Sequence, residues 1–392
     1  MAGAVSFAED GRLSPLSTPS ATRAVLEAHG IGTKYTLGQN FLVNDDVLKK
    51  IVALAEVEEN DRILEVGPGI GTLTIALLKH AQSVVAIERD PDLPAVLADT
   101  LHPWREKFAL IEKDALDVTA DDITAAMEEC RGVPGGAHQA SSAANAISPV
   151  GCRAERGLSE RLSATRKPDP GESPSEDGLS ESRYPAAEPP GSSQWRSPNK
   201  LVANLPYAVA ATVVLDFFQN FPFLDSATIM VQKEVADRMA AAVGTKSYGA
   251  YTVKLGLYAE PAGRFAVGPG NFFPPPRVDS AVIRLNRRVP AMADGAEATA
   301  EVIAAAGLMA DAAFTNRRKT LANSCKTYFS GRKSLTLPQA EGRACEYDGA
   351  ALAARLPELF EAAAIDPRRR GETLSQQEFL ALGDALLETM AS

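Results

Sequence analysis

The stretch Ile63-Leu64-Glu65-Val66-Gly67-Pro68-Gly69-Ile70-Gly71 joins a short apolar strand directly to a glycine-rich loop. Residues 72–78, which follow the loop, have the apolar composition of a buried helix. A strand, a glycine loop and a helix in this order form the nucleotide-binding crossover of an open parallel α/β sheet. Glycine lets the backbone approach a ligand closely, and the first turn of the helix offers unpaired N–H groups. The stretch therefore predicts an α/β fold with a ligand-binding loop at one sheet edge.

The spacing of the glycines limits the kind of ligand. Gly67, Gly69 and Gly71 follow the pattern G-x-G-x-G, whereas a dinucleotide pyrophosphate is typically bound by G-x-G-x-x-G. An acidic residue, Glu65, stands two positions before the first glycine. This combination favours a ligand with a ribose and a charged tail but no phosphate, such as S-adenosylmethionine. A glycine loop taken alone is a weak signal, so a plain turn stays open as the alternative.

Two more acidic residues follow the next two predicted strands. Glu88 comes directly after the apolar run 84–87, and a carboxylate there can accept hydrogen bonds from both hydroxyls of a ribose. Asp114 comes shortly after the apolar run 108–111 and could accept a hydrogen bond from an adenine amino group. The alternative for each is an ordinary acid in a solvated loop.

A second turn follows the predicted strand that contains Leu201-Val202. Its sequence, Ala203-Asn204-Leu205-Pro206-Tyr207, places an amide, a rigid proline and an aromatic ring at the carboxyl end of that strand. Ligands of open α/β sheets bind at this edge. The structural alternative is a strand-to-helix turn in which Asn204 acts as a cap and Pro206 fixes φ. The turn by itself does not decide between these two interpretations.

The composition is that of a globular chain large enough for two domains. Of its 392 residues, 45% are hydrophobic and 23% are charged, and no apolar run approaches the length of a membrane span. The four cysteines and four histidines are scattered, so we expect no metal site and a reducing, cytoplasmic environment. The net charge of −10 argues weakly against a nucleic-acid partner, but it does not exclude a local basic patch.

Residues 131–198 interrupt the strand and helix pattern. Pro, Gly and Ser make up 29 of these 68 residues, and such a segment buries too little apolar surface to offset its ordering entropy. We therefore expect a disordered insertion, and we also expect residues 1–16 to be disordered. Asp114 and Asn204 are 90 positions apart, and subtracting the 68 leaves 22, which is about one crossover helix with its loops.

From about residue 290 the pattern is helical, and we expect no further strand. Residues 251–257 either alternate as a strand does or begin another helix. Arg317, Arg318 and Lys319 are consecutive and are predicted to fan over more than one helix face, and Lys246 lies in a polar loop. A solvated surface and contact with phosphates both remain open for these cations.

Four features that suit a ligand thus lie at successive strand ends: the glycine loop, Glu88, Asp114 and Asn204. Each is ordinary alone, but their order on one parallel sheet is typical of an adenosylmethionine-dependent methyltransferase. We therefore predict an α/β fold with a Rossmann-like class I methyltransferase sheet, followed by a small C-terminal α-helical domain.

With these motifs in view, the chain resembles the KsgA-type (RsmA/KsgA) small-subunit rRNA adenine N6-dimethyltransferases. The resemblance spans nearly the whole chain outside about the first 20 residues and the insertion. The matching segments are Gly38-Gln39-Asn40-Phe41-Leu42, Glu65-Val66-Gly67-Pro68-Gly69, Asn204-Leu205-Pro206-Tyr207, Gln232-Lys233-Glu234-Val235, Phe272 through Ser280, and Ala313-Phe314 through Leu321.

The resemblance implies a set of site residues. Those expected to bind S-adenosylmethionine are Asn40, Leu42, Gly67, Glu88, Asp114 and Asn204. The residues expected to hold the target amine and base are Asn204, Leu205, Pro206, Tyr207 and Phe272. The two rings would stack on an extruded base, and three consecutive prolines from Pro274 would hold Phe272 in place.

The resemblance also implies an organisation and a substrate. Residues 1–28 would be an N-terminal extension, 29–289 a methyltransferase domain interrupted at 131–198, and 290–392 an α-helical rRNA-binding domain. The expected substrate is two adjacent adenosines near the 3′ end of small-subunit rRNA, each dimethylated, within an immature small ribosomal subunit. Contacts to RNA would come from Arg317, Arg318, Lys319 and Lys246. We expect a monomer in the cytoplasm, without a membrane or metal.

Two alternatives stay open at this point. One is a non-catalytic ribosome-assembly factor that binds RNA, and the other is a large-subunit rRNA adenine methyltransferase of the resistance type. The insertion and the acidic net charge both depart from the family pattern.

Overall fold

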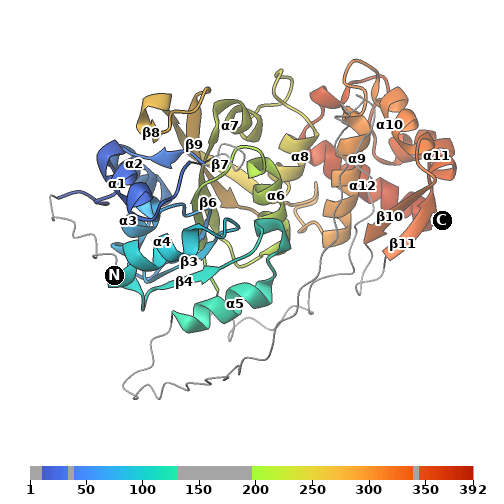
Figure 1. Cartoon of the computed structure of the whole chain (residues 1–392). Helices are drawn as coiled ribbons and strands as arrows, with labels where there is room; N and C mark the ends of the chain where they lie inside the picture. The colour runs from blue at the N-terminus through green and yellow to red at the C-terminus, as the bar shows by residue number, and fades with distance from the viewer. Residues whose placement is uncertain (1–10, 34–38, 131–196, 339–343, 392) are drawn as a thin grey trace, which may run out of the picture. The chain divides into compact units, whose positions relative to one another are not determined.

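A seven-stranded mixed sheet forms the centre of the N-terminal two thirds of the chain (Figure 1). The computed structural model describes residues 11–33, 39–130, 197–338 and 344–391, and all of them belong to one compact unit. The strand order is β4-β3-β2-β5-β6-β9-β7; the first five strands are parallel, and β9 and β7 are antiparallel to their neighbours. The strands are β2 (Arg62–Val66), β3 (Ser83–Ile87), β4 (Phe108–Ile111), β5 (Lys200–Asn204), β6 (Ser226–Gln232), β7 (Ala259–Val267) and β9 (Ser280–Arg287).

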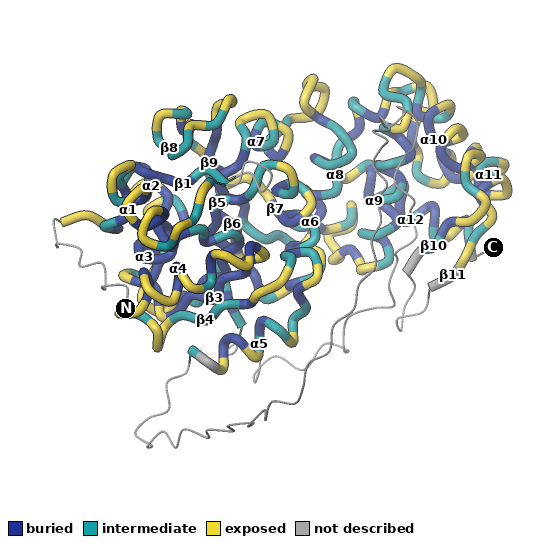
Figure 2. The backbone as a smooth tube through the Cα atoms, viewed as in Figure 1, coloured by how far each residue is buried: buried dark blue, intermediate teal, exposed yellow. Residues whose placement is uncertain are grey.

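Helices cover both faces of this sheet, so its central strands are buried (Figure 2). Consecutive residues of a strand point to opposite faces. Ile63 therefore packs against α2 and α3 in a first apolar core on one face of the sheet. Leu64 packs against α5 and α6 in a second core on the other face. The helices around the sheet are α2 (Asp45–Ala55), α3 (Thr72–Leu78), α4 (Leu93–Thr100), α5 (Ala120–Glu129), α6 (Ala210–Asn220), α7 (Lys233–Met239) and α8 (Ala250–Gly256).

The predicted N-terminal extension is in part integral to the fold. Helix α1 (Pro19–Ala28) begins at the cap residue Thr18, and both Leu16 and Val25 are buried in the first core. The Asp45 carboxylate accepts hydrogen bonds from the main-chain N–H groups of Leu13 and Ser14. The expectation that residues up to 16 are disordered is therefore wrong for 11–16, because these long-range partners were not visible in the local sequence. Residues 1–10 lie outside the described residues.

The insertion lies outside the described residues up to position 196. Ser197, however, is fixed to the sheet, because its carbonyl accepts a 2.8 Å hydrogen bond from Arg62 Nε. On either side of the insertion, α5 and β5 complete the expected βαβ crossover between β4 and β5. Residues 251–257, which the sequence left undecided, fall almost entirely within the helix α8.

The C-terminal part is mainly helical but also contains two strands. Its helices are α9 (Ala300–Phe314), α10 (Leu321–Ser330), α11 (Gly349–Ala362) and α12 (Gln376–Ala391). The expectation of no further strand is wrong, because β10 (Ser334–Pro338) pairs antiparallel with β11 (Ala344–Asp348). Unlike the equally short strands of the central sheet, neither segment contains a continuous apolar run that would mark a buried strand. Each strand is completed by the hydrogen bonds of its cross-strand partner, which the local sequence does not show.

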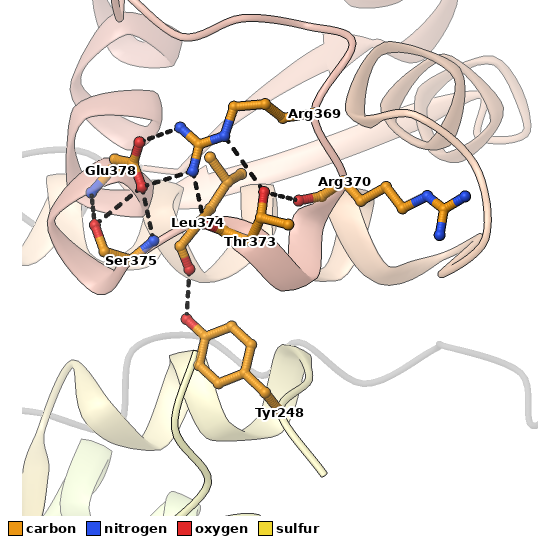
Figure 3. A network of polar contacts seen from close by, with 7 residues as sticks. All are labelled: Tyr248, Arg369, Arg370, Thr373, Leu374, Ser375 and Glu378. Atoms are coloured by element: carbon orange, nitrogen blue, oxygen red, sulfur yellow. Dashed lines mark hydrogen bonds and ion pairs between the residues drawn. The ribbon is translucent and has the colours of Figure 1, made fainter. Parts of the chain in front are cut away.

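The C-terminal part shares a core with the end of the sheet part. Tyr248 and α9 lie in the same apolar cluster, and Tyr248 Oη donates a 2.8 Å hydrogen bond to the Leu374 carbonyl (Figure 3). Burial raises the pKa of Tyr248 to about 12. Beside this bond, Glu378 accepts hydrogen bonds from Ser375 N and from the Arg369 guanidinium. The segment around Leu374 that binds Tyr248 is therefore itself held by the ion pair between Arg369 and Glu378.

Among the described residues, no helix has the length and apolar character needed to cross a membrane.

Candidate active site

A cavity of about 490 Å³ lies at the carboxyl ends of β2, β3 and β5. This is the sheet edge at which open α/β folds bind ligands. Its lining includes most of the residues that the sequence predicted for the site, namely Asn40, Leu42, Gly67, Glu88, Asn204, Leu205, Pro206 and Tyr207. It also includes residues that the sequence analysis did not assign, among them Gln39, Phe41, Glu65, Thr72, Arg89 and Gln232.

The glycine loop forms one wall of the cavity. Gly67 and Gly69 have φ values of +69° and +60°, a region that glycine adopts without strain. A Cβ atom on Gly69 would lie 3.1 Å from the Phe41 ring, and a Cβ on Gly67 would lie 3.6 Å from Pro206. The loop is thus packed between the Gln39–Leu42 segment and the Asn204–Tyr207 turn. A larger residue at position 69 would displace the Phe41 ring, whereas one at position 67 would be disfavoured by the positive φ rather than by a clash.

Glu88 lines the cavity, and its carboxylate is hydrogen-bonded to main-chain N–H groups. Only 8% of the residue is exposed, and its Oε1 accepts hydrogen bonds from the N–H groups of Arg89 and Asp90, at 2.9 and 2.8 Å. Burial raises the pKa of Glu88, while these N–H groups lower it. The backbone therefore orients this carboxylate at the strand end, where it can accept hydrogen bonds from ribose hydroxyls.

Glu65 is a second carboxyl group of the cavity, at the end of the neighbouring strand. It is 1% exposed, and burial raises its pKa to about 8, with the charge of Glu88 adding to the rise and the Thr74 hydroxyl opposing it. Within the described residues, Glu65 Oε2 and the buried hydroxyl of Thr72 have no hydrogen-bond partner. Buried polar atoms normally have partners, so these atoms fit a polar ligand group. The signal in the sequence was an acid two residues before Gly67.

The Asn204 side chain is fixed by the segment that carries Asn40. Its Nδ2 donates a 3.2 Å hydrogen bond to the Asn40 main-chain carbonyl. This bond determines which end of the amide is the nitrogen, and it leaves Oδ1 as the acceptor at the cavity. Next to it, Leu205 N donates to the Met230 carbonyl at 3.1 Å, which ties the turn to β6.

Comparison with known proteins identifies the family that has this arrangement. The sequence profile described as "Ribosomal RNA adenine dimethylase" matches residues 32–344. A relative from Enterococcus faecalis, named "Ribosomal RNA small subunit methyltransferase A", is 32% identical and aligns over 95% of this chain and 96% of its own length. The protein of that name from Staphylococcus aureus is 29% identical over 94% of each chain.

This chain belongs to the ribosomal RNA adenine dimethylase family. It is therefore a methyltransferase that uses S-adenosylmethionine and has ribosomal RNA as its substrate. The crystal structure of a dimethyladenosine transferase from Plasmodium falciparum has the same fold, with a TM-score of 0.53, 18% identity and coverage of 87% of this chain and 95% of that one.

In this dimethylase, the two rings predicted to stack on the base lie in different places. Tyr207 lines the cavity, and its Oη forms a 2.5 Å hydrogen bond with Ser280 Oγ. Phe272 is 3% exposed and does not line the cavity, because β8 (Phe272–Phe273) pairs with β1 (Phe41–Leu42) and turns Phe272 into the core. Stacking by Phe272 would require its side chain to leave the position seen here.

Asp114 is also placed differently from the prediction. It does not line the cavity; its Oδ2 accepts a 2.8 Å hydrogen bond from Arg89, and its Oδ1 caps the turn at Leu116 N. Arg89, from the end of the adjacent strand, lines the cavity instead. Asp114 therefore contacts the cavity lining through Arg89, and the pairing of β3 with β4 brings these two residues together.

The predicted basic residues divide into two groups. Arg317 is engaged within the protein, with Nε 2.9 Å from Glu372 Oε2 and a 2.9 Å hydrogen bond to the Thr245 carbonyl. It lies in the turn between α9 and α10, so the expected helix face is wrong: α9 ends at Phe314. Arg318, Lys319 and Lys246 are exposed.

A second run of arginines lies against this turn. The main-chain N–H groups of Leu321 and Ala322 donate to the carbonyls of Arg369 and Pro367, at 2.6 and 3.1 Å. These bonds bring the segment before the exposed Arg370 next to the turn that contains Lys319, although the two residues are 51 positions apart in the chain. No local sequence pattern indicates this proximity, because the two segments are distant in sequence.

Proposed function

We propose that this protein dimethylates the exocyclic amines of two adjacent adenosines near the 3′ end of small-subunit rRNA. Its substrate would be an immature small ribosomal subunit, and it would act as a monomer in the cytoplasm. The main support is the hydrogen bond from Asn204 Nδ2 to the Asn40 carbonyl, because it leaves the amide oxygen of a cavity-lining residue available to accept a hydrogen bond. The relatives named for the small subunit support the choice of RNA.

The order of the strands suggests how the cofactor would be held. At the sheet edge formed by β3, β2 and β5, the polar groups near the strand ends are Arg89 and Glu88 after β3, Glu65 in β2 and Asn204 at the end of β5. In our proposal, Arg89 borders the adenine, Glu88 accepts from the ribose hydroxyls, and Glu65 with Thr72 binds the amino-acid end. When bound, S-adenosylmethionine supplies a methyl group already activated by a sulfonium.

The target amine needs help because its lone pair is delocalised into the adenine ring. Asn204 Oδ1 would accept one hydrogen bond from this amine, and the Leu205 carbonyl would accept a second. The nitrogen then moves toward tetrahedral geometry, and its lone pair is directed at the methyl group. Pro206 keeps the Leu205 carbonyl in place. Most of the rate gain comes from proximity and orientation, and no strong base is needed because the amine loses its proton after it becomes cationic.

Tyr207 would hold the extruded base by stacking. A base stacked on an aromatic side chain gains about 1–3 kcal/mol. The hydrogen bond to Ser280 keeps the Tyr207 ring at the cavity wall, which lowers the cost of ordering it when RNA binds.

Contact with the ribosomal particle would come from residues 290–392 together with the loop around Lys246. Arg318, Lys319 and Arg370 are exposed cations on two segments that are joined by main-chain hydrogen bonds, and exposed cations neutralise RNA phosphates. Arg317 would act by holding the turn rather than by binding RNA.

The test is transfer of radiolabelled methyl groups from S-adenosylmethionine to small subunits that lack this modification, followed by mass spectrometry of the rRNA. We expect incorporation that approaches four methyl groups per subunit, on two neighbouring adenosines. Methylation of large-subunit RNA instead would contradict the proposed substrate, and tight binding without incorporation would indicate an assembly factor.

A further inference from the structure

Two carboxyl groups of the cavity lie at the ends of adjacent strands, but their surroundings differ. Glu65 is the fourth residue of β2, and Glu88 follows the last residue of β3. Glu88 receives two main-chain N–H hydrogen bonds, which stabilise its charged form. Glu65 is more deeply buried, and its Oε2 has no partner among the described residues. Of the two groups, Glu65 is therefore the one for which a negative charge is more costly.

No cation within the described residues compensates Glu65. Besides the two carboxyl groups, the charged lining of the cavity consists of Arg89, which is paired with Asp114 at 2.8 Å. Helix α3 contributes the hydroxyls of Thr72 and Thr74 but no charged side chain, and β3 has none either. The lysine of β5, Lys200, is at the opposite end of its strand and pairs with Asp61 at 2.7 Å.

We propose that Glu65 is protonated in the cofactor-free protein and releases this proton to solvent when the ammonium group of the cofactor binds beside it. The O–H bond of the carboxyl group breaks, the proton goes to water, and the carboxylate accepts an N–H hydrogen bond from the ammonium, which keeps its own protons. No net charge is added to the buried site. This inference rests on the proposed placement of the amino-acid end at Glu65 and Thr72.

The exchange makes cofactor affinity depend on pH. Because burial raises the pKa of Glu65 to about 8, the carboxyl group must lose its proton to bind the ligand at pH 6–7. Affinity should then rise about tenfold per pH unit in this window, by proton linkage. S-adenosylhomocysteine is a suitable probe, because it has the same amino-acid end and does not turn over.

The experiment is calorimetric titration of the full chain with S-adenosylhomocysteine at pH 7.0, in phosphate, imidazole and Tris buffers. The dependence of the observed heat on the ionisation enthalpy of the buffer gives the number of protons released. We expect close to one proton for the wild type, and an affinity that increases about tenfold from pH 6.0 to 7.0. Release of fewer than about 0.3 protons by the wild type would overturn the proposal.

Glu65→Gln and Glu59→Gln form the matched pair of variants. Glu65→Gln should release no proton, and its affinity should be constant between pH 6.0 and 7.0. Glu59 is exposed on the loop before β2, so Glu59→Gln should behave as the wild type does. Unchanged proton release by Glu65→Gln would assign the proton to another group and overturn the proposal.

Two outcomes separate this inference from the proposed function. The titrations of the wild type in the three buffers show whether a proton is released, even if Glu65→Gln does not fold. The titration contains no RNA, so a protein that releases the proton but does not methylate small subunits would contradict only the proposed substrate.

Discussion

Asn204 Nδ2 donates a hydrogen bond to the main-chain carbonyl of Asn40 at 3.2 Å, across 164 positions of sequence. The bond joins the two segments that enclose the glycine loop. It also engages the amide nitrogen of Asn204, so that the oxygen is the atom left to accept a hydrogen bond, as the proposed contact with the target amine requires. The segment of Asn40 and the turn of Asn204, which appear independent in the sequence, therefore meet at the Asn204 side chain.

The first prediction concerns this amide. Asn204→Ala should lower kcat at least about 100-fold, since it removes an acceptor that polarises the amine in the transition state. Its dissociation constant for S-adenosylhomocysteine should change by less than about threefold, as the hydrogen bonds that we assign to the cofactor's ribose and amino-acid end remain. Single-turnover methylation and calorimetry measure the two quantities. Near-native turnover of the variant would rule out the amine-polarising role.

Asn204→Asp supplies a matched control for the contact with Asn40. The carboxylate retains an acceptor toward the amine but cannot donate to the Asn40 carbonyl, so two oxygens would face each other. We expect it to be impaired like the alanine variant, and also to bind the cofactor less tightly than the wild type does. An active Asn204→Asp would show that the hydrogen bond to Asn40 is dispensable.

Tyr207 allows the ring and the hydroxyl to be tested separately. Tyr207→Phe keeps the stacking surface and loses the bond to Ser280, so kcat/KM for the subunit should fall only a few-fold. Tyr207→Ala should lower it about 10- to 100-fold, in line with the loss of about 1–3 kcal/mol of stacking. Cofactor affinity should be unchanged in both. Equal losses in the two variants would mean that the hydroxyl, and not the ring, matters.

Glu88 should determine cofactor affinity more than turnover. Glu88→Ala removes the acceptor for the ribose, and we expect S-adenosylhomocysteine to bind about 10- to 100-fold more weakly, the usual effect of losing charge-assisted hydrogen bonds. Glu88→Gln keeps one acceptor oxygen and should lose less. Calorimetry gives both constants. An affinity of Glu88→Ala within about twofold of the wild type would contradict the role of Glu88.

In the turn of Arg317, Arg318 and Lys319, we expect one structural residue and two residues that bind RNA. Arg317→Ala breaks the contacts with Glu372 and Thr245, and it should lower the melting temperature by about 2–4 °C. The double variant Arg318→Ala, Lys319→Ala should leave the melting temperature unchanged but weaken binding to small subunits. It should also reduce the salt dependence of binding by about two ions. The reverse pattern would exchange the two roles.

The stability of the cofactor-free protein should depend on pH in an unusual direction. Because the pKa of Glu65 is raised to about 8, the folded chain binds more protons than the unfolded chain between the ordinary value of about 4.5 and 8. Stability therefore falls as the pH rises through this window. The raised pKa of Glu88 acts in the same direction. The pKa values of Asp45 and Asp61 are lowered, so these two acids change the stability only at lower pH, where they begin to bind protons.

Thermal denaturation between pH 6 and 8.5 checks this prediction. The melting temperature of the wild type should decrease with pH, and that of Glu65→Gln should decrease less. Saturating S-adenosylhomocysteine should reduce the fall, because the ligand supplies the missing positive charge. A wild-type curve parallel to that of Glu65→Gln would assign the slope to other groups.

The sequence by itself determined the strands that end at the cavity, the glycine loop and the positions of Glu88 and Asn204 at strand ends. These features are local: apolar runs mark buried strands, glycine permits a positive φ, and a residue at the end of a parallel strand must lie at the ligand-binding edge. The family resemblance rests on the same short segments.

The tertiary structure alone decided the partners of the side chains. Asp114 pairs with Arg89 and does not line the cavity, and Phe272 is buried in the core where β8 pairs with β1. Arg317 forms an ion pair with Glu372. Within the part of the chain that the structure describes, the same packing buries Glu65 with no cation beside it. A hydrogen bond or a buried charge depends on which distant groups lie within a few ångströms, and no local pattern encodes that distance.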